Sequence, residues 1–338
     1  YDAHDVERTL RLVRGVPYHT PFEVLPSVRG EFRDAGHILG AAIVVLDVQH
    51  EHRSRRIVFT GDHGRKDLPI LRDPEPLPPC DVLITESTYG DRLHDARADM
   101  MADLARIVAE EQHDGGRIVV PAFAVGRTQA VVMFLGQLIR DGVLPRLPIH
   151  VDSPMASEAT RIMADHQHLF DDETLTLLRQ GHDPLYFDGV HYVGDVEQSK
   201  ALNELRTGVI VSASGMCESG RVLHHLRQTL GRRQDCVLMV GYQAQGTLGR
   251  RLLDGAERVN LLGESYDVKC RVRAISGFSA HADWRELMAA SAPLVDRCRQ
   301  VFVVHGEDEA AEAHAVRLRE AGFREVVVPT KGDVHEVR

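Results

Sequence analysis

The sequence has few cysteines, and none of them is spaced for a C-x-x-C pair. The five that are present are odd in number and scattered along the 338 residues, at Cys80, Cys217, Cys236, Cys270 and Cys298. Disulfide frameworks and cysteine-rich zinc sites both depend on paired spacing, so this pattern argues against either. We expect these cysteines to behave as small buried apolar residues.

Long hydrophobic runs are also missing. No apolar stretch approaches the roughly 18 residues that a membrane-crossing helix needs. The opening stretch YDAHDVERTL has none of the features of a signal peptide. We therefore expect a cytoplasmic protein with no membrane partner.

The charge balance is acidic, with a formal net charge of -10. This balance weighs against a protein that coats nucleic acid through overall positive charge. It leaves room for an enzyme that acts on nucleic acid, because only the binding groove of such an enzyme must be basic.

Several catalytic signatures are absent from the chain. It contains no H-E-x-x-H, G-x-x-x-x-G-K-[ST], G-x-G-x-x-G or G-x-S-x-G motif. Metalloprotease, P-loop, dinucleotide-binding and serine-hydrolase interpretations therefore have no support. The 19 histidines are a high count, and histidine is the commonest metal ligand.

Short β-branched apolar runs alternate with segments of helical periodicity. The alternation from about residue 117 to 254 predicts a parallel sheet with crossover helices, and hence an α/β fold. The predicted strands are 41–48, 55–61, 81–87, 117–122, 208–214, 236–242, 268–275, 301–306 and 324–329.

Polar residues recur close to the ends of these strands. His37 precedes one strand, whereas Asp62, Glu86, His281 and His305 each follow one. Taken singly, each is readily explained as a turn residue, a helix cap or a satisfied core group. Ligands of open α/β sheets gather beyond the carboxyl ends of strands, so we expect the five side chains to converge there. Imidazole and carboxylate ligands suit zinc, and Asp62 could bridge two metals.

An ordered set of motifs resembles the β-CASP branch of the metallo-β-lactamase superfamily. The members of this branch are RNA-processing nucleases. The motifs are DAGHILGAA, FTGDHGR, ESTYGDR, PAFAVGRTQ, DSPMA, SASGM, GYQAQGTLGR, GFSAHAD and VHGE. The resemblance implies a metallo-β-lactamase αββα body with an inserted β-CASP α/β domain. The expected division is 1–97 for the first part of the body, 98–252 for the β-CASP domain and 253–338 for the C-terminal part of the body.

The resemblance also implies roles for individual residues. His37 would bind one of two zinc ions, Asp62 would bridge both, and His305 would bind the second. Glu86 and His281 would form a hydrogen-bonded pair in which His281 protonates the leaving oxygen. The side chains implied to bind RNA phosphates are Arg127, Ser214 and Ser279.

One motif of the family is not found in these residues. The H-x-H-x-D-H segment, which supplies four zinc ligands, would lie upstream of Tyr1. We therefore expect an N-terminally incomplete body. Activity would need the missing segment, so this chain alone is expected to be inactive.

Three functions remain open. The first is a zinc-dependent ribonuclease that hydrolyses single-stranded RNA by a two-metal mechanism. The second is a non-catalytic RNA-binding scaffold that has lost metal ligands. The third, a hydrolase of small esters or thioesters, is disfavoured by the long β-CASP-like middle of the chain. The sequence leaves open a homodimer, and it does not distinguish internal from 5′-end cleavage.

Overall fold

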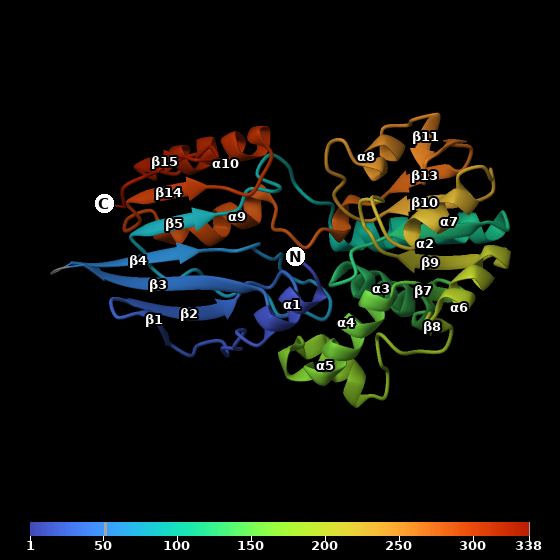
Figure 1. The fold of residues 1–338 in the computed structure, drawn as a ribbon, viewed down its shortest axis with the longest axis horizontal. Helices are drawn as coiled ribbons and strands as arrows, with labels where there is room; N and C mark the ends of the chain where they lie inside the picture. The colour runs from blue at the N-terminus through green and yellow to red at the C-terminus, as the bar shows by residue number, and fades with distance from the viewer. Residues whose placement is uncertain (51–52, 338) are drawn as a thin grey trace. The chain divides into compact units, whose positions relative to one another are not determined.

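A computed structural model describes residues 1–50 and 53–337. The chain divides into two compact units, coloured along the sequence in Figure 1. Unit 1 comprises residues 1–65, 74–92 and 281–338, and unit 2 comprises residues 66–73 and 93–280. The predicted boundaries at 97/98 and 252/253 remain predictions.

Unit 1 is built on a seven-stranded mixed sheet of order β1-β2-β3-β4-β5-β14-β15. Strands β1 to β4 pair antiparallel, whereas β4, β5, β14 and β15 are parallel neighbours. Its elements are α1 (Ala3–Leu10), β1 (Phe22–Leu25), β2 (Val28–Asp34), β3 (Ala42–His50), β4 (Arg53–Phe59), β5 (Val82–Thr85), α9 (Trp284–Ser291), β14 (Gln300–Val303), α10 (Asp308–Glu320) and β15 (Glu325–Val327).

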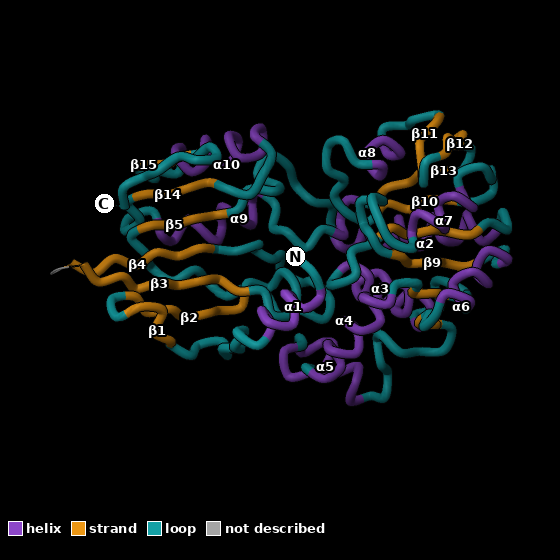
Figure 2. Tube along the Cα trace, in the orientation of Figure 1, coloured by secondary structure: helices purple, strands orange, loops and turns teal. Residues whose placement is uncertain are grey.

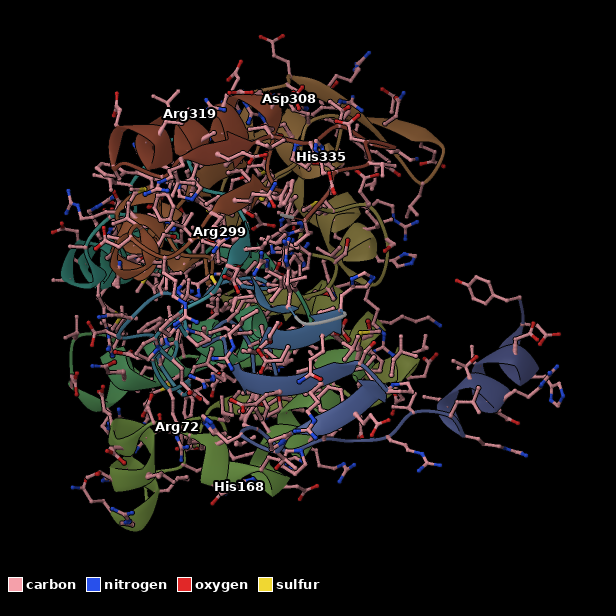
Figure 3. The ribbon with its side chains drawn as sticks, turned by 90° about the vertical axis from the view of Figure 1, so that its left-hand side faces the viewer. Arg72, His168, Arg299, Asp308, Arg319 and His335 are labelled. Carbon is pink, nitrogen blue, oxygen red and sulfur yellow. The ribbon has the colours of Figure 1, made fainter. Side chains whose placement is uncertain are left out.

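The two faces of this sheet differ in how they are covered. One face carries the core of the unit, in which Ile43, Val58, Leu83 and Val301 pack with Leu318 of α10. Arg319, on the same helix, donates to the carbonyl of Val326 (Figure 3). The alternate residues of the strands, which point to the other face, include the half-buried or exposed Val44, Leu46, Ile57, Phe59 and Ile84. An αββα body packs a second sheet against a face of this kind.

Unit 2 contains a six-stranded sheet of order β13-β10-β6-β9-β7-β8, in which every neighbouring pair is parallel. Its elements are α2 (Arg97–His113), β6 (Arg117–Pro121), α3 (Arg127–Arg140), β7 (Ile149–Val151), α4 (Pro154–Asp165), α5 (Asp172–Arg179), β8 (Val190–Tyr192), α6 (Val196–Ala201), β9 (Gly208–Ser212), α7 (Val222–Thr229), β10 (Cys236–Met239), α8 (Leu248–Leu253), β11 (Arg258–Leu261), β12 (Glu264–Asp267) and β13 (Arg271–Ala274). The all-parallel pairing confirms the α/β fold predicted from the alternation of strands and helices.

The strands that the sequence pattern missed are short or lie at sheet edges, except for β2, which has seven residues and lies between β1 and β3. They are β1, β2, β7, β8, β11 and β12 (Figure 2). Strand β7, for example, spans three residues and follows the proline-containing stretch LPRLP. Too few residues then remain to show a period of two.

Two further observations complete the fold. The short segment 66–73 is tied to unit 2 by Arg72, which donates to the carbonyl of His168 at 2.6 Å (Figure 3). Within residues 1–50 and 53–337, no helix has the length and apolar character needed to cross a membrane.

A buried ion pair supports the amino end of the six-stranded sheet. Arg117, the first residue of β6, donates its Nε to Asp235 Oδ2 at 3.1 Å, and both side chains are almost fully buried. The Arg117 Nη1 donates to the carbonyls of Leu202 and Asn203, both at 3.3 Å. Removal of one partner would leave a buried charge without compensation.

We expect Asp235→Ala to lower the free energy of unfolding of unit 2 by about 3–5 kcal/mol, because Arg117 stays buried without its counter-ion. Asp188→Ala is the matched control, since Asp188 pairs with Arg146 on the exposed surface and its loss should change little. Thermal unfolding followed by circular dichroism measures both. Equal midpoints for the two variants would contradict a structural role for the buried pair.

Candidate functional site

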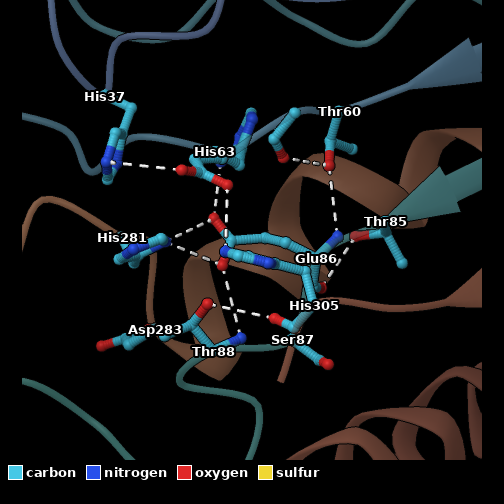
Figure 4. Close-up of polar contacts among 12 residues, drawn as sticks. His37, Thr60, His63, Thr85, Glu86, Ser87, Thr88, His281, Asp283 and His305 are labelled. Carbon is cyan, nitrogen blue, oxygen red and sulfur yellow. Dashed lines mark hydrogen bonds and ion pairs between the residues drawn. The ribbon is translucent and has the colours of Figure 1, made fainter. Parts of the chain in front are cut away.

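Three neighbouring parallel strands of unit 1 each end close to a polar residue. Asp62 follows β4, Glu86 follows β5 and His305 follows β14. Because β4, β5 and β14 are hydrogen-bonded in that order, these residues emerge at the same edge of the sheet. His37 enters from the turn between β2 and β3, and His281 from the segment before α9 (Figure 4).

Two of the turns that carry these residues require unusual backbone. Gly61, just before Asp62, has a φ of 58°. His305 has a φ of 52°, which is uncommon for a residue with a side chain and costs free energy that the surrounding structure must offset. A Cβ on the following Gly306 would run into Ser87, so only glycine fits there. The carbonyl of His305 accepts bonds from Ser87 N and Thr88 Oγ1, which fixes the turn.

Asp62 lies between two histidines. Its Oδ2 is 3.8 Å from His37 Nε2, and its Oδ1 is 3.2 Å from His305 Nε2. Each carboxylate oxygen of Asp62 therefore faces a different imidazole. Two ligand atoms on the same tetrahedral zinc, each about 2.05 Å from the metal, lie roughly 3.3 Å apart. Both distances from Asp62 to the histidines are close to this value, so Asp62 and each histidine could bind the same zinc ion.

His281 lies within the same group of donor atoms. His37, Asp62 and His281 each offer one atom, and these atoms lie within 4.8 Å of one another. The ring centroids of His37 and His281 are 4.3 Å apart, and those of His281 and His305 are 6.0 Å apart. Imidazole nitrogens and carboxylate oxygens are ligands that zinc accepts, so the donor set fits a zinc centre.

Glu86 is the buried anchor of the site. Its carboxylate accepts a bond from His281 Nδ1 at 2.9 and 3.0 Å, from the amide of His63 at 2.5 Å and from the amide of Thr88 at 3.3 Å (Figure 4). Burial by itself raises the pKa of Glu86, but the hydrogen bond and charge of His281, together with the bonds from Thr88 and His63, hold it below its usual value. An ionised carboxylate can only accept hydrogen bonds, so His281 Nδ1 carries a proton. The other ring nitrogen, Nε2, is not used in the bonds to Glu86.

Backbone contacts hold the His281 segment in place. His281 bridges to Gly64, and the amide of Ala282 donates to the carbonyl of His63 at 2.8 Å. Asp283 begins α9 with a capping box, in which it accepts from the amide of Glu286 and Glu286 accepts from the amide of Asp283. Within GFSAHAD, Asp283 and not His281 therefore caps the helix, and the imidazole of His281 is available to the site.

The sequence pattern missed the groups that support the five predicted side chains. The amides of His63 and Thr88 hold Glu86, and a single sequence carries no signal for a backbone donor of this kind. The three residues predicted to bind phosphate lie in unit 2. Arg127 begins α3, Ser214 follows β9, and Ser279 is almost fully buried.

Ser214 also organises its own loop. Its hydroxyl accepts bonds from the amides of Glu218 and Ser219 at 3.1 and 3.3 Å. These contacts leave the hydroxyl hydrogen available as a donor.

We expect stability to depend on pH through Glu86. Because the folded pKa is lowered, its contribution is present above the pKa of the unfolded chain, about 4.3, and is lost as pH falls through the folded value. Glu86→Gln should therefore show a shallower fall in unfolding free energy between about pH 5 and pH 3. Trp284, the single tryptophan, lies in unit 1 and reports urea unfolding by fluorescence.

Glu309→Gln, on the exposed surface of α10, is the control and should keep the slope of the parent protein. If Glu86→Gln and Glu309→Gln have the same pH dependence, the bonds to Glu86 do not lower its pKa.

Comparisons with known proteins found two matching families and several similar relatives. The family described as the Beta-Casp domain matches residues 128–252, and the Zn-dependent metallo-hydrolase RNA specificity domain matches residues 265–329. Ribonuclease TTHA0252 of Thermus thermophilus is 33% identical over 310 residues, which cover 91% of this chain and 69% of the relative.

Two archaeal relatives are similar at comparable levels. Transcription termination factor FttA of Methanosarcina mazei is 31% identical over 345 residues, which cover 98% of this chain and 52% of that protein. The RNase J-like protein of Methanocaldococcus jannaschii is 28% identical over 340 residues, which cover 99% of this chain and 77% of that protein. The chain thus spans about half the length of the termination factor.

Proposed function

Because the chain belongs to the β-CASP family of metallo-β-lactamase-fold RNA nucleases, we propose that it forms part of a zinc-dependent ribonuclease that hydrolyses single-stranded RNA. The observation that carries the proposal is the position of Asp62, whose two carboxylate oxygens face His37 and His305, while Glu86 holds His281 beside them. We also propose the division into a body at 1–97 and 253–338 and a β-CASP domain at 98–252.

In this proposal, His37, Asp62 and His305 hold the metal. If two zinc ions were bound, the Asp62 carboxylate would be shared between them, with His37 as a ligand of one and His305 as a ligand of the other. When bound, zinc would polarise the scissile phosphate and lower the pKa of the attacking water toward 7. The Asp62 side chain is 44% exposed, which leaves it accessible to ions from solvent.

His281 and Glu86 move the proton. Water loses one proton to solvent, its oxygen bonds to phosphorus, and the bond from phosphorus to the leaving oxygen breaks as His281 Nε2 gives its own proton to that oxygen. Glu86 keeps the other proton on Nδ1 and stabilises the imidazolium before transfer. Arg127, Ser214 and Ser279 are proposed to contact RNA phosphates.

We expect Asp62→Asn to lower the zinc content of the protein, because the amide replaces an anionic bridge with a neutral group that supplies one good acceptor. Asp47→Asn is the matched control, since Asp47 is 40% exposed, lies in the same unit and pairs with Arg56. Elemental analysis after equilibration with zinc measures both. Zinc content that is equally high in both variants would exclude the bridging role, and the absence of zinc from the longest natural form of the protein would favour the RNA-binding scaffold.

In a protein that includes the upstream segment expected to carry the H-x-H-x-D-H motif, we expect His281→Ala to slow cleavage of a single-stranded RNA by about 10²–10⁴-fold, because the leaving oxygen loses its proton donor. His19→Ala, at a surface pair with Glu75, should retain the parent rate. Zinc content distinguishes the roles of His281. If zinc is retained, His281 acts as the acid, whereas loss of zinc would make it a third ligand with His37 and Asp62. Undiminished cleavage would remove His281 from the mechanism.

A further inference from the structure

Three loops lie side by side at the carboxyl edge of the six-stranded sheet in unit 2. Strands β6, β9 and β7 are consecutive neighbours, with Pro121 opposite Ser212 and Val151 opposite Val211. The loops that follow them begin at Ala122, Ala213 and Asp152. Ligands of parallel α/β sheets bind at this edge.

Phe123, in the first of these loops, presents an aromatic ring to solvent. Its exposed fraction is 43%, Val125 of the same loop is also exposed, and the first turn of α4 adds the exposed side chain of Met155. The ring lies over Gly215, where an added Cβ would be 3.2 Å from Phe123 Cδ2. Gly215 directly follows Ser214, so the ring adjoins a residue already proposed to contact phosphate.

The loop that carries Phe123 is held rigidly. The carbonyl of Phe123 accepts bonds from the buried Thr128, at 3.2 Å from its amide and 2.8 Å from its hydroxyl. The fully buried Gln129 donates its Nε2 to the carbonyls of Ala124 and Ala156, at 3.1 and 3.3 Å. Gln129 therefore joins the Phe123 loop to the first turn of α4, and the backbone that carries the exposed ring has little conformational freedom left to lose on binding.

Arg221 supplies a positive charge at the same edge. Its Nη1 donates to Oδ1 of the fully buried Asp152 at 2.6 Å, while 21% of its side chain stays exposed. Asp152 Oδ2 in turn accepts from His225 Nε2 at 2.6 Å and from Ser199 Oγ at 2.5 Å. Burial by itself raises the pKa of Asp152, but the bonds from His225, Ser199 and Arg221 lower it, so the carboxylate is charged and orients the guanidinium.

We propose that this edge binds single-stranded RNA by stacking one base on Phe123 and holding a nearby phosphate with Arg221, a subsite that rests on the proposed ribonuclease function. An exposed ring and a cation on loops that follow the neighbouring strands β6 and β9 match the alternation of bases and phosphates in an unpaired strand. A duplex hides the faces of its bases in the stack, so the ring selects single strands.

The test measures binding without cleavage, in a buffer that contains a chelator. A labelled oligoadenylate and an abasic oligomer of the same length are titrated with the parent protein, Phe123→Leu and Phe123→Trp by fluorescence anisotropy. Leucine keeps the apolar contact with Gly215 but has no aromatic face, whereas tryptophan keeps one. We expect Phe123→Leu to bind oligoadenylate about 10-fold to 100-fold more weakly, Phe123→Trp to bind it as the parent does, and all three to bind the abasic oligomer equally.

The tryptophan variant adds a direct signal. Its new emission, measured above the background from Trp284, should be quenched by oligoadenylate and unaffected by the abasic oligomer. Equal affinity of the parent and Phe123→Leu for oligoadenylate would overturn the stacking contact, as would an absence of binding by the parent.

Arg221 is tested by the salt dependence of oligoadenylate binding. Arg221→Gln should reduce the slope of log affinity against log salt by about 0.7, the value for one phosphate contact on a single strand. Arg221→Lys should retain the slope of the parent, and Phe123→Leu should not alter it. A slope unchanged in folded Arg221→Gln would remove the phosphate contact, and thermal midpoints by circular dichroism identify the folded variants.

The subsite and the nuclease can fail separately. Cleavage by the zinc-loaded parent with equal binding by Phe123→Leu would reject the subsite and keep the ribonuclease. Base-dependent binding through Phe123, together with no cleavage by a zinc-loaded protein that includes the upstream metal motif, would reject the ribonuclease and keep the subsite.

Discussion

The buried carboxylate of Glu86 is the interaction on which the candidate site depends. It joins three segments that are far apart in the chain, because it accepts bonds from the amides of His63 and Thr88 and from His281 Nδ1. A buried carboxylate without such donors would be protonated or would destabilise the fold. The same bonds that compensate its burial therefore also orient His281 and fix the tautomer that it presents to the site.

The geometry around Asp62 follows from the topology of unit 1. Parallel pairing of β4, β5 and β14 brings Asp62, Glu86 and His305 to one edge, and the strained turn at His305 aims its imidazole at Asp62. The cost of this backbone is offset by the contacts of Gly306 and the His305 carbonyl with the segment after β5. The arrangement is typical of functional sites, where strain persists because the surroundings leave no alternative.

In unit 2, as in unit 1, loops at the carboxyl edge of a sheet carry exposed side chains that buried polar groups hold in place. Gln129 fixes the backbone beside Phe123, and Asp152 fixes the guanidinium of Arg221. In both units the groups that meet solvent are positioned by buried partners, so mutations in those partners should alter function without touching a ligand.

From the sequence alone, the α/β class and most of the longer strands could be predicted, and five polar residues, His37, Asp62, Glu86, His281 and His305, could be proposed as members of one site. Those features are local, since hydrophobic periodicity and the residues that end a strand can be read within a few positions. The Glu86–His281 pair was implied only by the resemblance to a known family, and the tertiary structure shows the two side chains in contact across 195 positions. The structure also sets Asp62 between two histidines and lays Phe123 against Gly215. Such contacts depend on strand order, on backbone donors and on the space that a missing Cβ leaves, and no short window of sequence contains that information.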